Sequence, residues 1–219
     1  MKITVATYNV HNTDGTKSLG GIGEEIKETC AHFVGLQELD VGVGRSLRKN
    51  TLAELNKICQ YPSAIFAKSI DYDGGDYGIG AMFSFPLVSM QKYTLPSTKE
   101  QRIVIRLVLE TEKGNVSFFN THLSLEKEDR ARQFDFLSGL LSGEDRFILT
   151  GDFNIASFDE FSSIRNIKTA NSEAKPINTF KSGGYIDNIV ISDNLSFESV
   201  YLCESEFSDH NMLVATINL

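Results

Sequence analysis

The chain carries at residues 146–154 the sequence RFILTGDFN, in which an apolar run is followed at once by Gly-Asp-Phe-Asn. A short run of this kind, bounded by turn-forming residues, is typical of a buried strand. We therefore expect a strand over Arg146–Thr150, with Asp152 and Asn154 directly after it. Alone, this pair predicts little more than a turn, because Asp and Asn at a strand end most often bond to their own backbone.

Polar residues stand in the same position beside other expected strands. They are Asn9, Gln37, Glu38, Asn120, His122, Asp187, Asp209 and His210. If these strand ends meet at one rim, the rim carries a cluster of carboxylates, amides and histidines. Mg²⁺ and similar hard cations prefer oxygen ligands, and a bound metal ion can activate water. A lone histidine such as His122 is more often structural. The repeated placement of polar residues at strand ends is what indicates a metal-dependent site.

The remaining strands and helices follow from the apolar periodicity. Further strands are expected at Ile3–Val10, Phe33–Leu39, Ser63–Ile70, Gly78–Ser84, Leu87–Leu95, Ile103–Glu110, Val116–Leu123, Ile186–Ser192, Phe197–Cys203 and Met212–Leu219. Helical spacing predicts three helices: one with Ile22, Ile26, Cys30 and Phe33 on one face, one with Leu52, Leu55 and Cys59, and one over Lys127–Leu141. About eleven strands with isolated helices favour two stacked, mostly antiparallel sheets. Asp71–Gly80 is expected to be a loop.

The bulk composition is ordinary for a soluble globular protein, and the 219 residues predict one domain over residues 1–219. No apolar run approaches the ~18 residues that a membrane helix needs, and the N-terminus lacks the pattern of a signal peptide. The three cysteines, Cys30, Cys59 and Cys203, form no metal-binding or disulfide spacing and are expected to be buried small hydrophobes. These features together predict a cytoplasmic protein without a membrane span, and we expect a monomer.

Six motifs, in order along the chain, resemble those of the endonuclease/exonuclease/phosphatase superfamily. They are TYNV at residues 7–10, LQE at 36–38, NTHL at 120–123, GDFN at 151–154, ID at 186–187 and SDH at 208–210. Each motif alone is weak, but the ordered set runs from Asn9 to His210 and is specific. The resemblance implies a four-layer α/β sandwich, in which two packed, mixed, mostly antiparallel β-sheets are flanked by helices.

The resemblance also implies a metal centre and a set of catalytic roles. Glu38 would be the principal ligand of a Mg²⁺ or Mn²⁺ ion, with Asn9 and Asp209 close to the metal. Asp152 would position or activate the attacking water, and Asn154 would hold a phosphate oxygen.

The same resemblance places the histidines and three further residues at the substrate phosphate. Asp187 would orient His210 toward the scissile phosphate, and His122 would aid phosphate binding or protonation of the leaving group. The three further phosphate contacts would be Tyr77, Arg102 and Asn120. Tyr77 could equally be a loop aromatic that covers the core, and Arg102 a solvated arginine at a strand edge.

Some residues depart from the family pattern or lie outside it. Ser84-Phe85-Pro86 lacks the arginine that many relatives carry after the glycine-rich strand. Asp40 and Arg45 follow Glu38 closely; we expect a local salt bridge between them, the alternative being that Arg45 reaches the substrate.

The function expected is hydrolysis of a phosphodiester or phosphomonoester (EC 3.1.-) by in-line attack of activated water. The net charge of −8 argues against broad capture of nucleic acid, so a small or flexible substrate is favoured. The alternative within the enzyme class is a DNA or RNA endo- or exonuclease. A lipid enzyme is disfavoured by the lack of Trp. A non-catalytic scaffold is less favoured still, because such a protein would be free to lose Asp152, Asp187 or His210.

Overall fold

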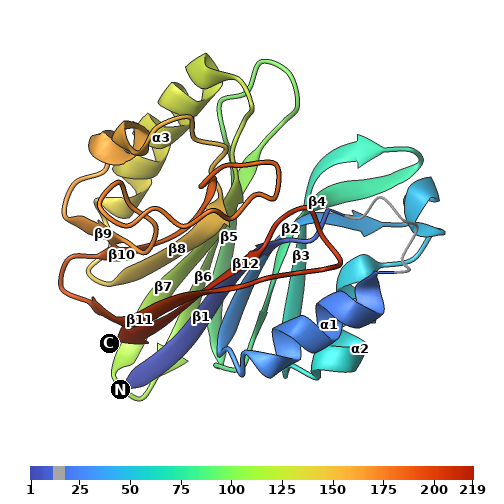
Figure 1. Ribbon diagram of the computed structural model, residues 1–219, viewed down its shortest axis with the longest axis horizontal. Helices are drawn as coiled ribbons and strands as arrows, with labels where there is room; N and C mark the ends of the chain where they lie inside the picture. The colour runs from blue at the N-terminus through green and yellow to red at the C-terminus, as the bar shows by residue number, and fades with distance from the viewer. Residues whose placement is uncertain (12–17) are drawn as a thin grey trace.

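The computed structural model describes residues 1–11 and 18–219, which form two six-stranded sheets with helices outside them (Figure 1). The first sheet contains β1 (Lys2–Asn9), β2 (Phe33–Val41), β3 (Ser63–Tyr72), β4 (Gly75–Phe83), β11 (Ser196–Cys203) and β12 (Met212–Asn218). The second contains β5 (Leu87–Thr94), β6 (Ile103–Thr111), β7 (Gly114–His122), β8 (Phe147–Asp152), β9 (Ile167–Thr169) and β10 (Asp187–Ser192). The helices are α1 (Leu19–Glu28), α2 (Thr51–Cys59) and α3 (Lys127–Leu141), with 3₁₀ turns η1 (Gly44–Ser46) and η2 (Phe158–Ser163).

Each sheet contains one parallel strand pair among antiparallel neighbours. The strand orders are β11-β12-β1-β2-β4-β3 and β5-β6-β7-β8-β10-β9. The parallel pairs are β1 with β2, joined through α1, and β7 with β8, joined through α3. The expected four-layer α/β sandwich with two mixed, mostly antiparallel sheets is therefore confirmed.

The core between the sheets is filled by alternate residues of facing strands. Phe33 of β2 and Phe118 of β7 lie at its centre, with ring centroids 4.7 Å apart. Burying an apolar side chain of this size contributes roughly 1.5–3 kcal/mol. A polar side chain buried in this layer would need a hydrogen-bond partner within the protein. Polar groups are therefore expected at the strand ends, where the layer opens to solvent.

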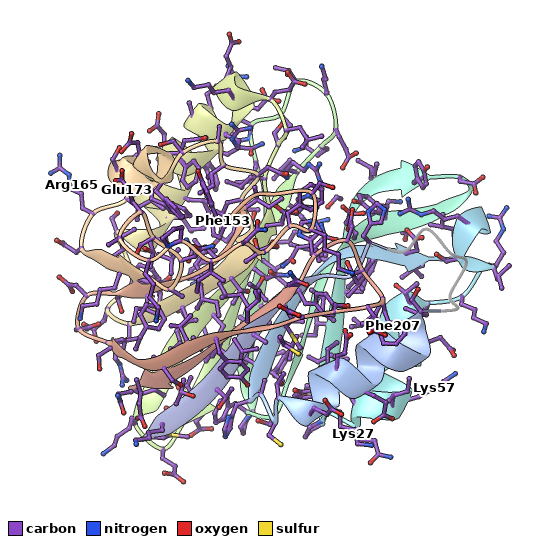
Figure 2. The ribbon with its side chains drawn as sticks, in the orientation of Figure 1. Lys27, Lys57, Phe153, Arg165, Glu173 and Phe207 are labelled. Atoms are coloured by element: carbon purple, nitrogen blue, oxygen red, sulfur yellow. The ribbon has the colours of Figure 1, made fainter. Side chains whose placement is uncertain are left out.

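The helices cover the two outer faces. α1 and α2 lie together against the first sheet, burying Ile22, Ile26 and Leu55, while Lys27 and Lys57 point away into solvent (Figure 2). On the other side, α3 packs on the second sheet through a cluster of buried apolar side chains that includes Phe153. No helix within residues 1–11 and 18–219 is long and apolar enough to cross a membrane.

The expectation of a loop over Asp71–Gly80 is wrong, because this segment is a β-hairpin. β3 and β4 are joined by a two-residue turn at Asp73 and Gly74, both of which have positive φ, 43° and 74°. An Asp-Gly pair in this conformation is typical of a type I′ turn, whose twist matches that of the flanking strands. The polar, glycine-rich composition therefore marked a tight turn between strands.

The first helix ends earlier than expected, and one cysteine is not buried. α1 ends at Glu28, and Cys30 adopts a left-handed φ of 50° that turns the chain toward β2. Cys30 is exposed, and Cys59 and Cys203 are half-buried. The apolar spacing of α1 extends by coincidence into the connection between α1 and β2. Cys30 lies in this connection, so it is not on the helix face that covers the sheet. The short strand β9 was not expected.

Candidate active site

Polar side chains from both sheets meet at one end of the sandwich, where the two parallel strand pairs end. Asn9 is the last residue of β1, and His122 and Asp152 are the last of β7 and β8. The strand register places His122 beside Asp152 on one side and Asp187, the first residue of β10, beside it on the other. Asp152 therefore lies at the centre of a polar rim.

Glu38 reaches this rim through a β-bulge within β2. The pairing of β2 with β4 shifts register between Leu36 and Leu39, and Glu38 has a left-handed φ of 60°. A non-glycine residue in this conformation costs on the order of 1–3 kcal/mol. Asn9 Nδ2 donates to Glu38 Oε1 at 3.0 Å and to Asp152 Oδ2 at 2.9 Å. One buried amide thus joins a carboxylate from each sheet.

Glu38 and Asp209 approach one another on either side of His11. His11 Nδ1 lies 3.3 Å from Glu38 Oε2 and 3.8 Å from Asp209 Oδ2. Asp209 Oδ1 is buried and has no hydrogen-bond partner in the described part of the chain. These two carboxylates, of which Asp209 has the buried oxygen without a hydrogen bond, fit the ligand preference of Mg²⁺ or Mn²⁺. Asn9 Oδ1 accepts from the backbone N–H of His11 at 3.0 Å and has a second lone pair, so its expected place close to the metal stays a prediction.

The site predicted from the sequence does not include His11. Its position two residues after Asn9, a candidate metal contact, is the local feature that indicates it. Burial alone would raise the pKa of Glu38. Hydrogen bonds from His11 and Asn9 outweigh burial and hold that pKa well below its usual range. Glu38 is therefore an anion at neutral pH, as a metal ligand must be.

His210 and Asp187 form a buried pair beside this position. His210 Nδ1 lies 2.8 Å from Asp187 Oδ2, and both residues are almost fully buried. Burial alone would lower the pKa of His210, but the charge and hydrogen bond of Asp187 raise it to about 9. His210 is therefore an imidazolium at neutral pH, and its Nε2 lies 3.8 Å from Asp152 Oδ2.

The ligand atoms of Asp152, Asp187 and His210 lie within 4.8 Å of one another, so these residues could also hold a metal ion. However, His210 Nδ1 and Asp187 Oδ2 are already bonded to each other. Within the described residues, Asp187 Oδ1 is buried without a hydrogen-bond partner just as Asp209 Oδ1 is. A charged imidazolium has no lone pair for a metal ion, however, so His210 disfavours this position, and Glu38 with Asp209 makes the better one.

His122 is held in the opposite charge state from His210. Burial, followed by the positive charge of Arg102, lowers the pKa of His122 well below 6.5. Arg102 Nη1 lies 2.9 Å from His122 Nδ1. A guanidinium can only donate, so Nδ1 carries the lone pair and Nε2 carries the proton. His122 Nε2, 3.5 Å from Asp152 Oδ2, is therefore a neutral donor at the rim.

The carboxyl group of Asp152 titrates far above its usual range. Burial and then the charge of Asp187 raise its pKa to about 7, against the opposing effects of His210 and of hydrogen bonds from Asn9 and Asn154. Asn154 N–H donates to Asp152 Oδ1 at 3.0 Å, in a left-handed conformation with φ of 50° that asparagine tolerates. A carboxylate with a pKa near neutrality is well matched to accepting a proton from water.

Asn120 is not positioned to contact a substrate, which corrects the expectation from the sequence. Its side chain is fully buried between the sheets. Its Nδ2 donates to the carbonyl oxygens of Leu36 and Gly80, and its Oδ1 accepts from Gln37 Nε2 and Thr150 Oγ1. With all four hydrogen bonds satisfied inside the protein, Asn120 ties the two sheets together beneath the rim.

Tyr77 and Arg102 lie on the β4 and β6 side of the rim. Tyr77 belongs to β4 and is nearly buried, so it is not a loop aromatic. Arg102 is also buried and pairs with Glu100 at 3.0 Å, so it is not a solvated edge residue. The expected salt bridge is present, with Arg45 Nε 2.8 Å from an Asp40 carboxylate oxygen.

The model of the endonuclease/exonuclease/phosphatase family matches residues 6–210 of the chain. The chain belongs to the endonuclease/exonuclease/phosphatase family. Members of this family include nucleases and phosphodiesterases and are generally divalent-metal-dependent hydrolases of phosphoesters. No curated protein sequence matches the chain.

Several solved structures share the fold of the chain at low sequence identity. A functionally unknown conserved protein from Enterococcus faecalis V583 has a TM-score of 0.83 at 15% identity, with 99% of each chain covered. The endonuclease/exonuclease/phosphatase from Bacteroides vulgatus has a TM-score of 0.81 at 19% identity, covering 100% of this chain and 99% of that one. Truncated Caenorhabditis elegans TDP2 has a TM-score of 0.77 at 20% identity, covering 100% and 98%.

Proposed function

We propose that this member of the endonuclease/exonuclease/phosphatase family hydrolyses phosphoester bonds with the help of Mg²⁺ or Mn²⁺. The observation that carries the proposal is the position of Asp152. Its carboxylate lies between a neutral histidine donor, His122 Nε2 at 3.5 Å, and a charged one, His210 Nε2 at 3.8 Å. A proton acceptor flanked by two donors is suited to activating water beside a phosphoryl group.

Glu38 and Asp209 would hold the metal ion, which when bound supplies positive charge to the phosphoryl oxygens. Asp152 accepts a proton from the attacking water, and its raised pKa lets it do so near neutral pH. His210, fixed by Asp187, donates Nε2–H to a phosphoryl oxygen. His122 donates Nε2–H to a second phosphoryl oxygen or to the leaving group. The leaving group departs from phosphorus in line with the attacking water. Asn154 Nδ2 donates one hydrogen to the carbonyl oxygen of Leu123 at 3.0 Å, and its second N–H would hold a phosphate oxygen.

The number of groups is appropriate to the difficulty of the reaction. Hydrolysis of the slowest phosphate esters requires up to ~10²¹-fold acceleration. A single general base supplies only about 10²–10⁴-fold. The carboxylates, amides and imidazoles must therefore act together, which is consistent with their gathering around one carboxylate.

The test is an activity screen with Mg²⁺ and Mn²⁺ across single-stranded DNA, RNA, nucleotides, phospholipids and sugar phosphates. Asp152→Asn and Glu38→Gln should each lower kcat/KM by about 10³-fold or more, as loss of a central group does in comparable sites. The matched control is Glu198→Gln, an exposed carboxylate on β11 paired with Lys2. Metal-independent hydrolysis, or full activity in Asp152→Asn, would refute the proposal.

The metal position has its own test, since a crystal soaked in Mn²⁺ reports directly on it. Anomalous density should lie beside Glu38 and Asp209. Density at Asp187 and His210 only, or at a remote surface position, would contradict the assignment of Glu38 as the principal ligand.

The substrate is proposed to be small or flexible, with a DNA or RNA nuclease as the alternative. Support for the small substrate comes from the net charge of −8. A monomer in the cytoplasm remains part of the proposal; size-exclusion chromatography with light scattering tests the monomer. A non-catalytic scaffold is disfavoured because the polar rim retains Asp152, Asp187 and His210.

A further inference from the structure

The loop between β11 and β12 carries both Asp209 and His210, so its position decides where these two side chains lie. The second half of the loop is held by backbone hydrogen bonds to the segment before β10. Lys181 N–H donates to the Asp209 carbonyl oxygen at 2.9 Å, and Asn211 N–H donates to the Thr179 carbonyl oxygen at 2.7 Å. The first half of the loop is held in a different way, by side chains.

Ser205 is at the centre of this first half. Its Oγ accepts from the backbone N–H groups of Phe207 and Ser208, at 3.0 and 3.2 Å. Ser208 Oγ in turn accepts from the backbone N–H of His210 at 3.1 Å, and both serines are buried. The place of Ser205 therefore sets the course of the backbone up to His210, and with it the direction in which Asp209 points.

Helix α1 holds Ser205 through Tyr8 and Glu25. The Tyr8 hydroxyl oxygen lies 2.5 Å from Ser205 Oγ and 2.8 Å from Glu25 Oε2, and Tyr8 is fully buried. A tyrosine has one hydroxyl hydrogen and a carboxylate only accepts, so Tyr8 donates to Glu25 and accepts from Ser205. Glu25 Oε1 also accepts from the backbone N–H of Glu206 at 3.2 Å. One carboxylate on α1 thus reaches the loop directly and through a tyrosine.

An apolar contact joins the same helix to the loop. Phe207 lies over α1 (Figure 2), and a Cβ at Gly21 would be 2.2 Å from its ring. Gly21 and Glu25 are four residues apart, so they lie on one face of the helix. This face of α1 therefore contacts the loop twice, once through a ring and once through a carboxylate.

We propose that Glu25 is a positioning residue, which through Tyr8 and Ser205 fixes the loop that presents Asp209 to the metal ion. The inference rests on the proposed function, in which Glu38 and Asp209 hold the metal. Groups that orient metal ligands from behind are needed for tight binding, and their loss typically lowers metal affinity about 10- to 100-fold. The inference gives α1, which lies on the outer face of the first sheet, a part in the metal site.

Three variants separate positioning from charge. Glu25→Ala removes both contacts and should leave α1 intact, because alanine is the best helix former. Glu25→Gln removes the charge but can keep both contacts, since its Oε1 can accept from Glu206 and its Nε2 can donate to the Tyr8 oxygen. Glu24→Ala is the matched control, because Glu24 is exposed on the same helix and lies 3.7 Å from Lys27.

The first measurement is the affinity of the full chain for Mn²⁺, followed by electron paramagnetic resonance. Glu25→Ala should weaken binding about 10- to 100-fold, whereas Glu25→Gln and Glu24→Ala should keep the affinity of the unmodified protein. The titration is made where all the proteins are folded, so a general loss of stability would not change the affinity. Unchanged affinity in Glu25→Ala, or an equal loss in Glu25→Gln, would overturn the inference.

The second measurement needs no metal, because hydrogen exchange of single backbone amides reports on the loop itself. In Glu25→Ala the amides of residues 206–208 should exchange about 10- to 100-fold faster, as loss of a hydrogen bond to a charged group implies. The amide of Asn211, which is held from the β10 side, should keep its rate. Unchanged exchange at residues 206–208 would also contradict the role of Glu25.

Failure of the proposed function is separable from failure of this inference. If the unmodified protein binds no Mn²⁺ beside Asp209 but Glu25→Ala speeds exchange at residues 206–208, the metal assignment fails and the role of Glu25 in fixing the loop stands. If Mn²⁺ binds beside Asp209 with equal affinity in the unmodified protein and in Glu25→Ala, the positioning role fails alone.

Discussion

At the scale of single residues, the site holds two histidines in opposite charge states a few ångströms from one carboxylate. The difference comes from the partner of each Nδ1. Arg102 can only donate, so His122 must accept there and stay neutral, whereas Asp187 can only accept, so His210 donates and becomes charged. In the proposed reaction, this edge of the fold would present a neutral donor and a cationic donor to the same phosphate.

His210 and Asp187 should act as a unit in catalysis. Asp187 is buried and fixes the tautomer of His210, so removing either partner disables the same function. Asp187→Asn and His210→Ala should each lower kcat/KM strongly, and the double variant should lose little more than His210→Ala alone. Steady-state kinetics on all four proteins measures this coupling. Fully additive losses would show that the two residues work separately.

The same pair should make the stability of the metal-free protein depend on pH. The pKa of His210 is about 9 in the folded protein, above its ordinary value of 6.5. A histidine whose folded pKa is raised stabilises the fold fully below its unfolded pKa, and this contribution is lost as pH rises through the folded pKa. The free energy of unfolding should therefore fall by about 3 kcal/mol between pH 6.5 and 9.

Denaturant titrations in the presence of a chelator measure this change. Asp187→Asn is the control, because loss of the carboxylate removes the cause of the raised pKa of His210. The variant should be less stable near pH 6.5 and nearly independent of pH in the same window. An unchanged stability of the parent protein from pH 6.5 to 9 would contradict a charged His210.

At the scale of elements, the two sheets approach closely beneath the rim, where Gly35 of β2 leaves room for polar side chains of the other sheet. A Cβ at Gly35 would overlap Thr150 Oγ1 and lie 2.7 Å from Asn120 Oδ1. Gly35→Ala should destabilise the protein by about 1–3 kcal/mol, as overpacking of a core does. Gly139 is the matched control, since it lies in α3 with nothing within 4 Å of the same position.

Gly139→Ala should stabilise the protein by about 0.5–1 kcal/mol, because alanine is the better helix former. Thermal or denaturant unfolding of both variants gives the comparison. A neutral Gly35→Ala variant would show that the sheets can separate at this point without cost, contrary to the packing around Asn120.

The sequence predicted the rim but not its geometry. Asp152, His122 and Asp187 stand at strand ends, a position visible in the local pattern. The displacement of Glu38 depends on the register of β2 against β4, and the burial of Asn120 depends on partners from other strands. Such long-range pairing has no local signature. The Asp73–Gly74 turn does have a local signature, because an Asp-Gly pair with positive φ at both residues is typical of a tight hairpin turn.

At the scale of the whole molecule, the arginines that could have formed a basic face are engaged within the protein. Arg45, Arg102 and Arg106 pair with carboxylates, at 2.8, 3.0 and 2.6 Å. Arg48 donates to the backbone carbonyls of Gly42 and Asp73. The three paired arginines therefore contribute little net positive charge, and Arg48, which keeps its charge, adds only one cation to a chain that carries −8 overall.

This charge distribution predicts weak binding to long duplex DNA. Non-specific duplex binding draws mainly on Lys and Arg contacts to phosphates, and its log affinity falls with log salt by about 0.9 per phosphate contacted. With Ca²⁺ in place of the catalytic metal, a duplex of a few helical turns should bind weakly, with a slope corresponding to fewer than about three phosphates. Fluorescence anisotropy across a salt series measures both quantities. Tight binding at physiological salt with a steep slope would show a basic face that the net charge conceals, and would make a duplex nuclease the better description of the enzyme.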